Sequence, residues 1–230
     1  MKIHGLQKMT LLDFPGRVAC TVFLGGCDFR CPFCHNFQLI DGSAPPMMEE
    51  EELLAFLRKR KGLLEGVAFT GGEPCLRPEL PDLMARIREM GFGVKLDTNG
   101  NHPARLREIL ERGLADYVAM DVKNSPEKYA ATCGLSVLDL GPIRESVALL
   151  LEGKTDYEFR TTVVDELHEA EDFEAIGKWI AGAGRYFLQS FTDRDAVPFE
   201  GLHAPSKEKL QNCRDIAAKY VPETRLRGVD

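Results

Sequence analysis

The sequence of 230 residues contains no run of about 18 apolar residues, so no transmembrane helix is expected. It begins Met1-Lys2-Ile3-His4, without the apolar segment of a secretory signal, and its seven cysteines are an odd number. We therefore expect a cytoplasmic protein without disulfides. A basic excess is also absent. The 29 Lys and Arg face 36 Asp and Glu, a net charge of −7 that argues against general nucleic-acid binding.

A fourth cysteine is missing from the segment in which three cysteines cluster. Cys27, Cys31 and Cys34 follow one another at spacings of four and three residues. Structural zinc takes four protein ligands, whereas an iron–sulfur cubane held by three cysteines leaves one iron free for another ligand. The alternatives are zinc with a distant fourth ligand such as Cys75, or three merely buried thiols. The Gly-, Pro- and aromatic-rich loop favours a shielded cluster.

Short apolar runs alternate with amphipathic segments, a pattern typical of βα units and a parallel sheet. An apolar content of 44% suits one α/β domain over residues 1–230. Strands are expected at 18–24, 66–70, 92–96, 117–120, 157–163 and 186–191. Helices are expected at 49–61, 77–90, 103–112, 138–151, 173–183 and 206–219, with a loop at 40–48. Six units are too few for a closed eight-stranded barrel, so the sequence predicts a partial (βα)6 TIM-like barrel with outer helices.

Polar motifs follow the first four predicted strands where each strand ends. These motifs are the cysteine segment, Gly71-Gly72-Glu73-Pro74, Asp97-Thr98-Asn99-Gly100 and Asp121-Val122-Lys123. The carboxyl ends of parallel strands meet at one edge of a sheet, where ligands of α/β proteins bind. The sequence therefore predicts that these four motifs converge at an active site.

Each motif also has a structural interpretation. Gly-Gly after a strand is often a tight turn, Asp-Thr-Asn-Gly is a typical turn sequence, and Asp121 with Lys123 would suit a surface ion pair. Beside an open iron, Glu73 becomes a candidate partner for an ammonium group. Asp97 and Asp121 would repel a ligand carboxylate unless a cation lay between them, which predicts bound Na⁺ or K⁺.

Two later strands contribute weaker candidates. Arg160 and Gln189 interrupt runs that otherwise resemble core strands, so each is a candidate to point into the barrel. Their structural alternative is a partnership with the backbone or with each other. His35 directly follows the last clustered cysteine, and we expect it to pack or to form a hydrogen bond rather than bind iron.

These motifs resemble the radical S-adenosylmethionine (SAM) superfamily, and more closely its glycyl-radical-enzyme activases. The resemblance is carried by Cys-x3-Cys-x-Phe-Cys, Cys34-His35-Asn36, Thr70-Gly71-Gly72-Glu73-Pro74 and the motifs at 97–100 and 121–123, together with Gly5-Leu6-Gln7 and Asp13-Phe14-Pro15-Gly16. The resemblance covers the first half of the chain closely, and the remainder only through the alternation of predicted strands and helices. The chain is most similar to the short activating proteins of anaerobic ribonucleoside-triphosphate reductase.

The resemblance implies a set of ligands around SAM. Its [4Fe–4S] cluster would be held by Cys27, Cys31 and Cys34, with the fourth iron binding the amino and carboxylate groups of SAM. Phe33 would pack near the adenine, whose edge would be read by backbone groups around His35 and Asn36. The methionine ammonium would meet Gly71, Gly72 and Glu73.

The same resemblance implies how the SAM carboxylate is balanced. A monovalent-cation site would be formed by Asp97, Thr98 and Asp121. Lys123 would belong to an Asp-x-Lys element that responds to cofactor binding. Arg160 and Gln189 would contact the cofactor or the substrate.

The implied reaction needs no side chain as acid or base. One electron from a reduced flavodoxin or ferredoxin would cleave SAM to methionine and a 5′-deoxyadenosyl radical, which would abstract a glycine Cα hydrogen on a partner enzyme. No cysteine lies in residues 37–66, where many activases carry additional clusters, so an external donor is required. The short chain also predicts a barrel open at one side, which suits a macromolecular substrate.

Three other functions stay open on the sequence. One is the activation of a pyruvate formate-lyase-like enzyme, and another is a small-molecule radical SAM reaction such as that of 7-carboxy-7-deazaguanine synthase. The motifs Asp13-Phe14-Pro15-Gly16 and Cys34-His35-Asn36 favour an activase over the latter. The third is a non-catalytic electron-transfer or zinc-binding module, in which Gly-Gly-Glu and the two strand-end aspartates would have no role.

Overall fold

A curved sheet forms the centre of the molecule. The computed structural model describes residues 1–193 and 197–228, and within them eight strands pair in the order β10-β9-β8-β7-β6-β5-β3-β2. These strands are β2 (Gly5–Thr10), β3 (Ala19–Leu24), β5 (Gly66–Gly71), β6 (Gly93–Thr98), β7 (Tyr117–Asp121), β8 (Asp156–Val163), β9 (Tyr186–Ser190) and β10 (Thr224–Arg227). Pairing is parallel from β3 to β10, and β2 is antiparallel to β3.

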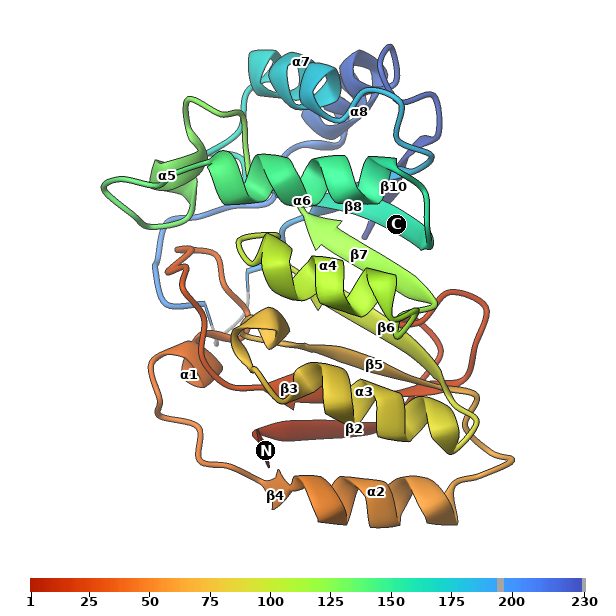
Figure 1. Ribbon diagram of the computed structural model, residues 1–230. Coiled ribbons are helices and arrows are strands. Elements are labelled where there is room, and N and C mark those ends of the chain that lie inside the picture. The colour runs from red at the N-terminus through yellow and green to blue at the C-terminus, as the bar shows by residue number, and fades with distance from the viewer. Residues whose placement is uncertain (194–196, 229–230) are drawn as a thin grey trace.

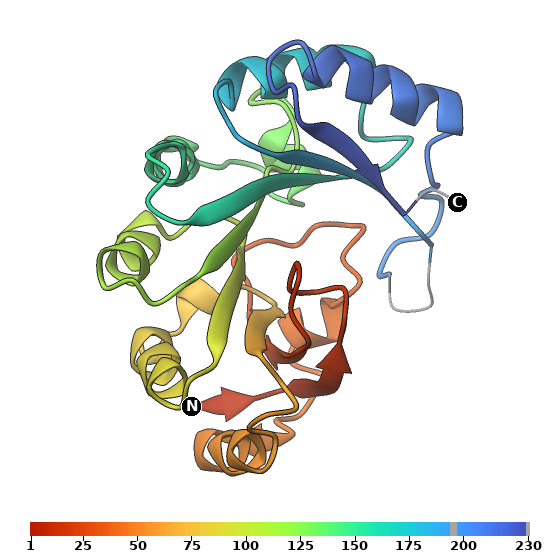
Figure 2. The ribbon, with the colours of Figure 1, turned by 90° about the vertical axis from the view of Figure 1, so that its right-hand side faces the viewer.

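Helices connect successive parallel strands and cover the outer face of the sheet (Figure 1). They are α2 (Glu50–Lys59), α3 (Leu80–Glu89), α4 (Pro103–Glu111), α6 (Gly141–Leu151), α7 (Ala170–Trp179) and α8 (Lys207–Ala217). Shorter elements are α1 (Phe37–Ile40), the 3₁₀ turn η1 (Pro74–Leu76), α5 (Tyr129–Thr132) and the pair β1 (Lys2–Ile3) and β4 (Met48–Glu49). Figure 2 shows the sheet as an incomplete barrel whose edge strands β2 and β10 lie apart.

The predicted partial barrel is therefore confirmed. All six predicted strands are present, each within two residues of its predicted ends, and each predicted helix overlaps a long helix. The two edge strands were not predicted. The strand β2 exposes Gln7, Lys8 and Met9, and β10 has the polar sequence Thr-Arg-Leu-Arg, so neither carries the apolar pattern of a buried strand.

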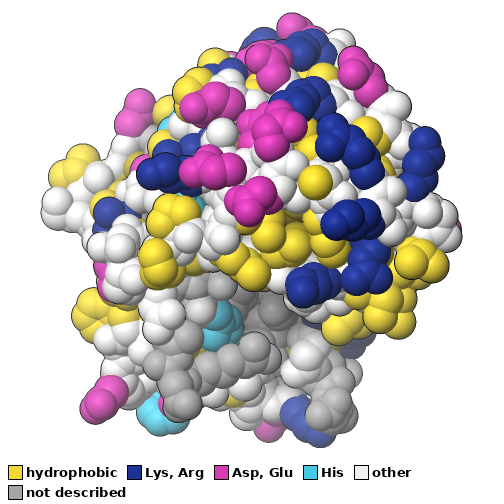
Figure 3. Space-filling model, turned by 90° about the horizontal axis from the view of Figure 1, so that it is seen from below, with side chains coloured by type: hydrophobic (Ala, Val, Ile, Leu, Met, Phe, Trp, Pro, Cys, Tyr) yellow, Lys and Arg dark blue, Asp and Glu magenta, His cyan; other side chains and the backbone are white. Residues whose placement is uncertain are grey.

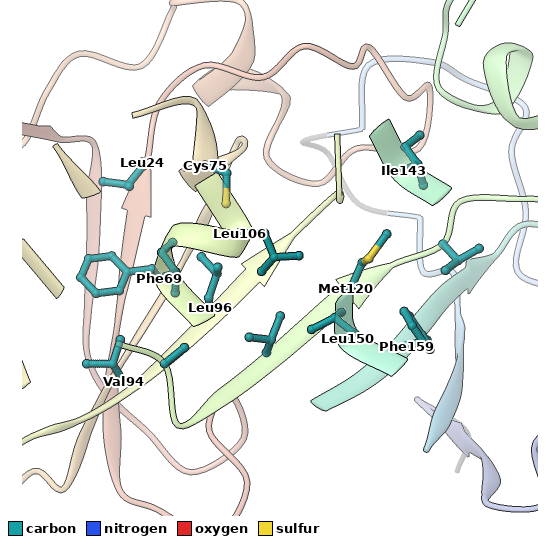
Figure 4. Close-up of a cluster of buried hydrophobic side chains, with 14 of the residues drawn as sticks. Leu24, Phe69, Cys75, Val94, Leu96, Leu106, Met120, Ile143, Leu150 and Phe159 are labelled. Carbon is teal, nitrogen blue, oxygen red and sulfur yellow. The ribbon is translucent and has the colours of Figure 1, made fainter. Parts of the chain in front are cut away.

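The main core lies between the sheet and the outer helices. Figure 4 shows side chains of the central strands, including Phe69, Leu96 and Met120, facing Leu106 of α4 and Leu150 of α6. All five are fully or almost fully buried. This apolar layer fixes the strand ends, and thereby the loops that follow them.

Local signals explain where the helices begin and end, as α2 illustrates. Glu49 and Glu52 form a capping box, and Leu53, Leu54 and Leu57 face the core. Acidic residues occupy the first turn and basic residues the last, which suits the helix dipole. Seen from below, several basic side chains gather toward the right of this face, and acidic and basic side chains are intermixed over the rest (Figure 3).

None of the helices in the described part of the chain is long and apolar enough to cross a membrane.

Candidate functional site

The three clustered cysteines lie in a loop between β3 and α1. Cys31 is buried, whereas Cys27 and Cys34 are partly exposed. The loop is held from two sides, because the Arg30 N–H donates to the Cys133 carbonyl at 2.8 Å and the Gly26 N–H donates to the Leu39 carbonyl at 2.7 Å. Its path is therefore fixed by neighbouring backbone as well as by its own turns.

The thiol chemistry of this loop depends on burial and hydrogen bonding. Burial raises the pKa of Cys27 to about 12, although its sulfur accepts the Phe29 N–H at 3.4 Å. Burial also raises the pKa of Cys34. A hydrogen bond from Cys133 instead lowers the pKa of Cys31. A metal that binds here must displace protons from at least the Cys27 and Cys34 thiols.

The donor set fits an iron–sulfur cluster better than a zinc ion. Within the described residues, no group of three or more His, Cys, Asp or Glu side chains is arranged to hold a single metal ion. Zinc requires its ligands around one centre, whereas a cubane distributes its thiolates over separate irons. Cys75, the predicted distant zinc ligand, is buried in η1 and packs in the core (Figure 4).

The four strand-end motifs converge, as predicted. They line one pocket at the carboxyl ends of β3, β5, β6 and β7. Its lining comprises Cys27, Phe29, Cys31, Phe33, Cys34, His35, Asn36, Ile40, Gly71, Gly72, Glu73, Asp97, Thr98, Asn99, Asp121, Lys123 and Thr162. Segments as far apart in sequence as Cys27 and Thr162 thus share one cavity.

Two glycines allow β5 to end directly against the cysteine loop. Gly71 has φ +119°, and a Cβ there would lie 2.4 Å from the Leu24 carbonyl oxygen. A Cβ on Gly72 would lie 1.9 Å from the Gly26 carbonyl oxygen. Asn36 also donates its amide to the Gly71 carbonyl at 3.1 Å. A side chain at either glycine would push the two halves of the pocket apart.

Glu73 joins the ends of β5 and β6. Its buried carboxylate accepts hydrogen bonds from the Cys75 N–H at 2.9 Å, the Thr98 hydroxyl at 2.8 Å and the Asn99 N–H at 2.7 Å. Burial raises its pKa in spite of these three donors. The carboxylate lines the pocket and also holds two loops together. Its predicted contact with an ammonium group stays a prediction.

Asp97 and Asp121 are bridged by a guanidinium group. Arg160 donates from Nε to Asp121 Oδ1 at 2.9 Å and from Nη1 to Asp97 Oδ2 at 3.4 Å. Lys95 pairs with Asp97, and Lys123 Nζ lies 3.0 Å from Asp121 Oδ2. Burial would raise the pKa of Asp121, but Arg160 and Lys123 outweigh it and lower that pKa to about 2. The protein's own cations therefore compensate both carboxylates, and the predicted Na⁺ or K⁺ site stays a prediction.

Aromatic residues form the other wall of the pocket. Phe33 is buried beside the cysteines, and the His35 ring stacks on Phe191 at a centroid distance of 5.6 Å. His35 Nε2 lies 2.7 Å from the Thr192 carbonyl oxygen. His35 thus packs and forms a hydrogen bond, as predicted, and links the cysteine loop to the segment after β9.

Two predicted residues lie outside the pocket lining formed by the described residues, and others were missed. Arg160 is one of the two, although its guanidinium pairs with the lining residues Asp97 and Asp121. Gln189 pairs with Thr162 across β8 and β9, so the two share a face of the sheet, but the Gln189 side chain is exposed and is not part of the pocket lining formed by the described residues. Four residues line the pocket without having been named individually as candidates, namely Phe29, Ile40, Asn99 and Thr162. Asn99 belongs to the motif at 97–100, so its place in the pocket could have been predicted from the sequence. A threonine within a strand, such as Thr162, carries no such indication.

Comparison with known proteins identifies relatives along the whole chain. The model of the radical SAM superfamily matches residues 21–179. A protein of Methanocaldococcus jannaschii with the provisional name glycyl-radical enzyme activating enzyme is 31% identical over 236 residues, covering 99% of this chain and 96% of that protein. A 7-carboxy-7-deazaguanine synthase of Thermococcus kodakarensis is 32% identical over 133 residues, covering 49% of this chain and 52% of the synthase.

The fold is also similar to solved structures. A crystallised domain of the pyruvate-formate lyase-activating enzyme from Bacteroides vulgatus superposes with a TM-score of 0.58 at 20% identity. The match covers 71% of this chain and 99% of that domain. At this identity, the likeness concerns the fold alone.

Proposed function

Because this chain belongs to the radical SAM superfamily, whose members use a [4Fe–4S] cluster and SAM, we propose that it activates a glycyl radical enzyme. The observation that carries the proposal is the single pocket shared by three cysteines and the motifs ending β5, β6 and β7. The activase assignment is supported by the relative that matches over 99% of this chain, whereas the deazaguanine synthase matches over about half.

In this proposal Cys27, Cys31 and Cys34 hold the cluster, and the remaining pocket residues orient SAM. When bound, these cofactors supply a 5′-deoxyadenosyl radical, formed with methionine by one-electron cleavage of SAM. That radical would take a hydrogen atom from a glycine Cα of the partner, which would leave 5′-deoxyadenosine and a glycyl radical. The electron comes from a reduced flavodoxin or ferredoxin. We infer a cytoplasmic setting, because the metal-binding thiols must stay reduced.

The polar end of SAM would be held by charges that the pocket already contains. Gly71 and Gly72 would present backbone groups to its ammonium, and Glu73 would balance the ammonium charge. Asp97, Thr98 and Asp121 would bind a monovalent cation beside its carboxylate. Lys123 and Arg160 would exchange part of their pairing with Asp121 for the cofactor.

The adenosine end would lie against the aromatic wall. Phe33 would pack near the adenine, and backbone groups at His35 and Asn36 would bind its edge. The stacking of His35 on Phe191 fixes this part of the loop before the cofactor arrives. Gln189, exposed on the same face of the sheet as Thr162, is better placed to meet a substrate than the cofactor.

The favoured partner is anaerobic ribonucleoside-triphosphate reductase, on the resemblance of the sequence to its short activating proteins. A pyruvate formate-lyase-like enzyme is the alternative partner. Because β2 and β10 are the edge strands of the described sheet and do not pair with each other, we expect a glycine loop of either partner to approach from this side.

Anaerobic reconstitution tests the cofactor part of the proposal. We expect a [4Fe–4S] cluster whose electron paramagnetic resonance (EPR) spectrum in the reduced state changes on addition of SAM, followed by release of 5′-deoxyadenosine. One equivalent of zinc, or a cluster indifferent to SAM, would contradict the proposal. A glycyl-radical EPR signal after mixing with each candidate partner would then identify the target.

A further inference from the structure

Asn99 contacts one of the proposed cluster ligands. Its side-chain amide nitrogen lies 3.8 Å from Cys27 Sγ and donates to Asp28 Oδ1 at 2.8 Å. An amide nitrogen carries two hydrogens, so both contacts can form at once. The Asn99 backbone N–H donates to Glu73, and its side-chain oxygen accepts the Asn101 N–H at 2.9 Å. The buried side chain therefore has little freedom to turn away.

The Asp28 carboxylate beside Cys27 is fixed in place by the contacts of both its oxygens. The Asn101 amide donates to Oδ2, and His102 Nε2 lies 3.2 Å from the same oxygen. Asp28 Oδ1 lies 3.8 Å from Cys27 Sγ, so a negative charge adjoins a proposed ligand.

We propose that Asn99 is a positioning residue that donates an N–H···S hydrogen bond to Cys27 and, with the same amide nitrogen, holds the Asp28 carboxylate that also contacts this sulfur. A donor to a ligand sulfur stabilises the reduced cluster, which carries one more negative charge. A nearby carboxylate has the opposite effect. Asn99 and Asp28 thus shift the reduction potential of the cluster in opposite directions. The inference rests on the proposed function only in requiring a cluster on Cys27, Cys31 and Cys34.

The test is a redox titration of the reconstituted protein, followed by EPR without SAM or partner. Asn99→Ser keeps an oxygen for the Asn101 N–H but removes the amide. We expect it to make reduction about tenfold less favourable, a shift of about 59 mV to lower potential for one electron. Asp28→Asn is expected to shift the potential upward by a similar amount. Asn101→Ser is the matched control, because Asn101 contacts Asp28 and has no hydrogen bond to the Cys27 sulfur among the described contacts.

The opposite signs separate electrostatic tuning from a structural role. A purely structural clamp would lower iron content in both variants without opposite shifts, and that result would overturn the inference. An equal shift in Asn101→Ser would also overturn it. If Asn99→Ser failed to bind the cluster, the reduction potential of Asp28→Asn alone would test the inference. An unchanged or lower potential in that variant would contradict it. Failure of the unsubstituted protein to bind a cluster would count against the proposed function instead.

Discussion

The two halves of the barrel build the pocket by different means. In the first half, β3, β5, β6 and β7 each end in a short polar loop, and the loops meet because the strands are adjacent and parallel. In the second half, β8 contributes Thr162 to the lining from within the strand, and Arg160 of the same strand bridges the lining residues Asp97 and Asp121. These side chains alternate with the buried Phe159, Thr161 and Val163. We call the first half, which supplies most of the described pocket lining, the closed half, and the second, which ends at the edge strand β10, the open half.

We therefore expect the first half to determine whether SAM is cleaved, and the second half to affect how a partner reaches the site. The closed half contains the three thiols, the close contact of Gly72 with the Gly26 carbonyl, and the Glu73 carboxylate with its three hydrogen bonds. Small changes there should abolish the reaction. The open half contains charge-balancing and exposed groups, so changes there should be graded. The comparison therefore predicts an order of effects along the chain.

The largest effect is expected in the cysteine loop. Cys31→Ala removes one of three thiolates, and 5′-deoxyadenosine production should fall to background because the cluster loses a ligand. The fold should persist, since the main core lies between the sheet and the helices. Iron content, circular dichroism and nucleoside release measure these outcomes, and Cys213→Ala in α8 is the control. Retained SAM cleavage would remove Cys31 from the ligand set.

The next largest effect is expected where β5 meets the cysteine loop. In Gly72→Ala, the new Cβ would lie 1.9 Å from the Gly26 carbonyl oxygen, so the loop must shift. We expect most cluster binding to be lost and the unfolding free energy to fall by about 1–3 kcal/mol. Gly184→Ala is the matched control, because nothing lies within 4 Å of the added Cβ. Equal cluster loading in the two variants would show that this contact is dispensable.

A smaller effect is expected in β8. Arg160→Met leaves Asp97 and Asp121 without their bridge, and we expect a loss of about 2 kcal/mol in unfolding free energy. Arg225→Met, which breaks the exposed pair with Glu223, should change stability by less than about 0.5 kcal/mol. Thermal or urea unfolding measures both, and similar losses would contradict the bridging role.

Arg160→Met should also alter how the unfolding free energy depends on pH in the acid range. The pKa of Asp121 is depressed from 3.8 to about 2, so its contribution is present above pH 3.8 and is lost as pH falls toward 2. We expect this contribution to be about 1–2 kcal/mol, since the side chain retains 31% exposure. In Arg160→Met the pKa of Asp121 should rise, and the acid-induced loss should begin at higher pH. Identical profiles would refute this assignment.

The smallest effect is expected at the open edge. Gln189 is exposed and lies outside the described pocket lining, so Gln189→Ala should change SAM cleavage without a partner by less than about twofold. A tenfold loss in the partner-free assay would place Gln189 in the cofactor site and erase the distinction between the two halves.

The same contrast explains what the sequence alone could predict. Apolar strands followed by glycines and carboxylates identify the first half, because both the strand pattern and the end of each strand are visible. Arg160 was a candidate only because a charge interrupts an apolar run, and its partners depend on a sheet register that the sequence does not specify. Thr162 was missed because a threonine is common in strands. The polar strand β10 was missed because its stability comes from pairing with β9 rather than from an apolar pattern.

The most direct test of the central claim follows the hydrogen atom itself. A partner glycyl radical enzyme, made with glycine deuterated at Cα, is incubated with the reconstituted protein, SAM and reductant, and the nucleoside product is analysed by mass spectrometry. We predict one deuterium in 5′-deoxyadenosine and a glycyl-radical EPR signal on the partner. Unlabelled 5′-deoxyadenosine with every candidate partner, together with turnover of a pterin in the absence of protein substrate, would contradict the account.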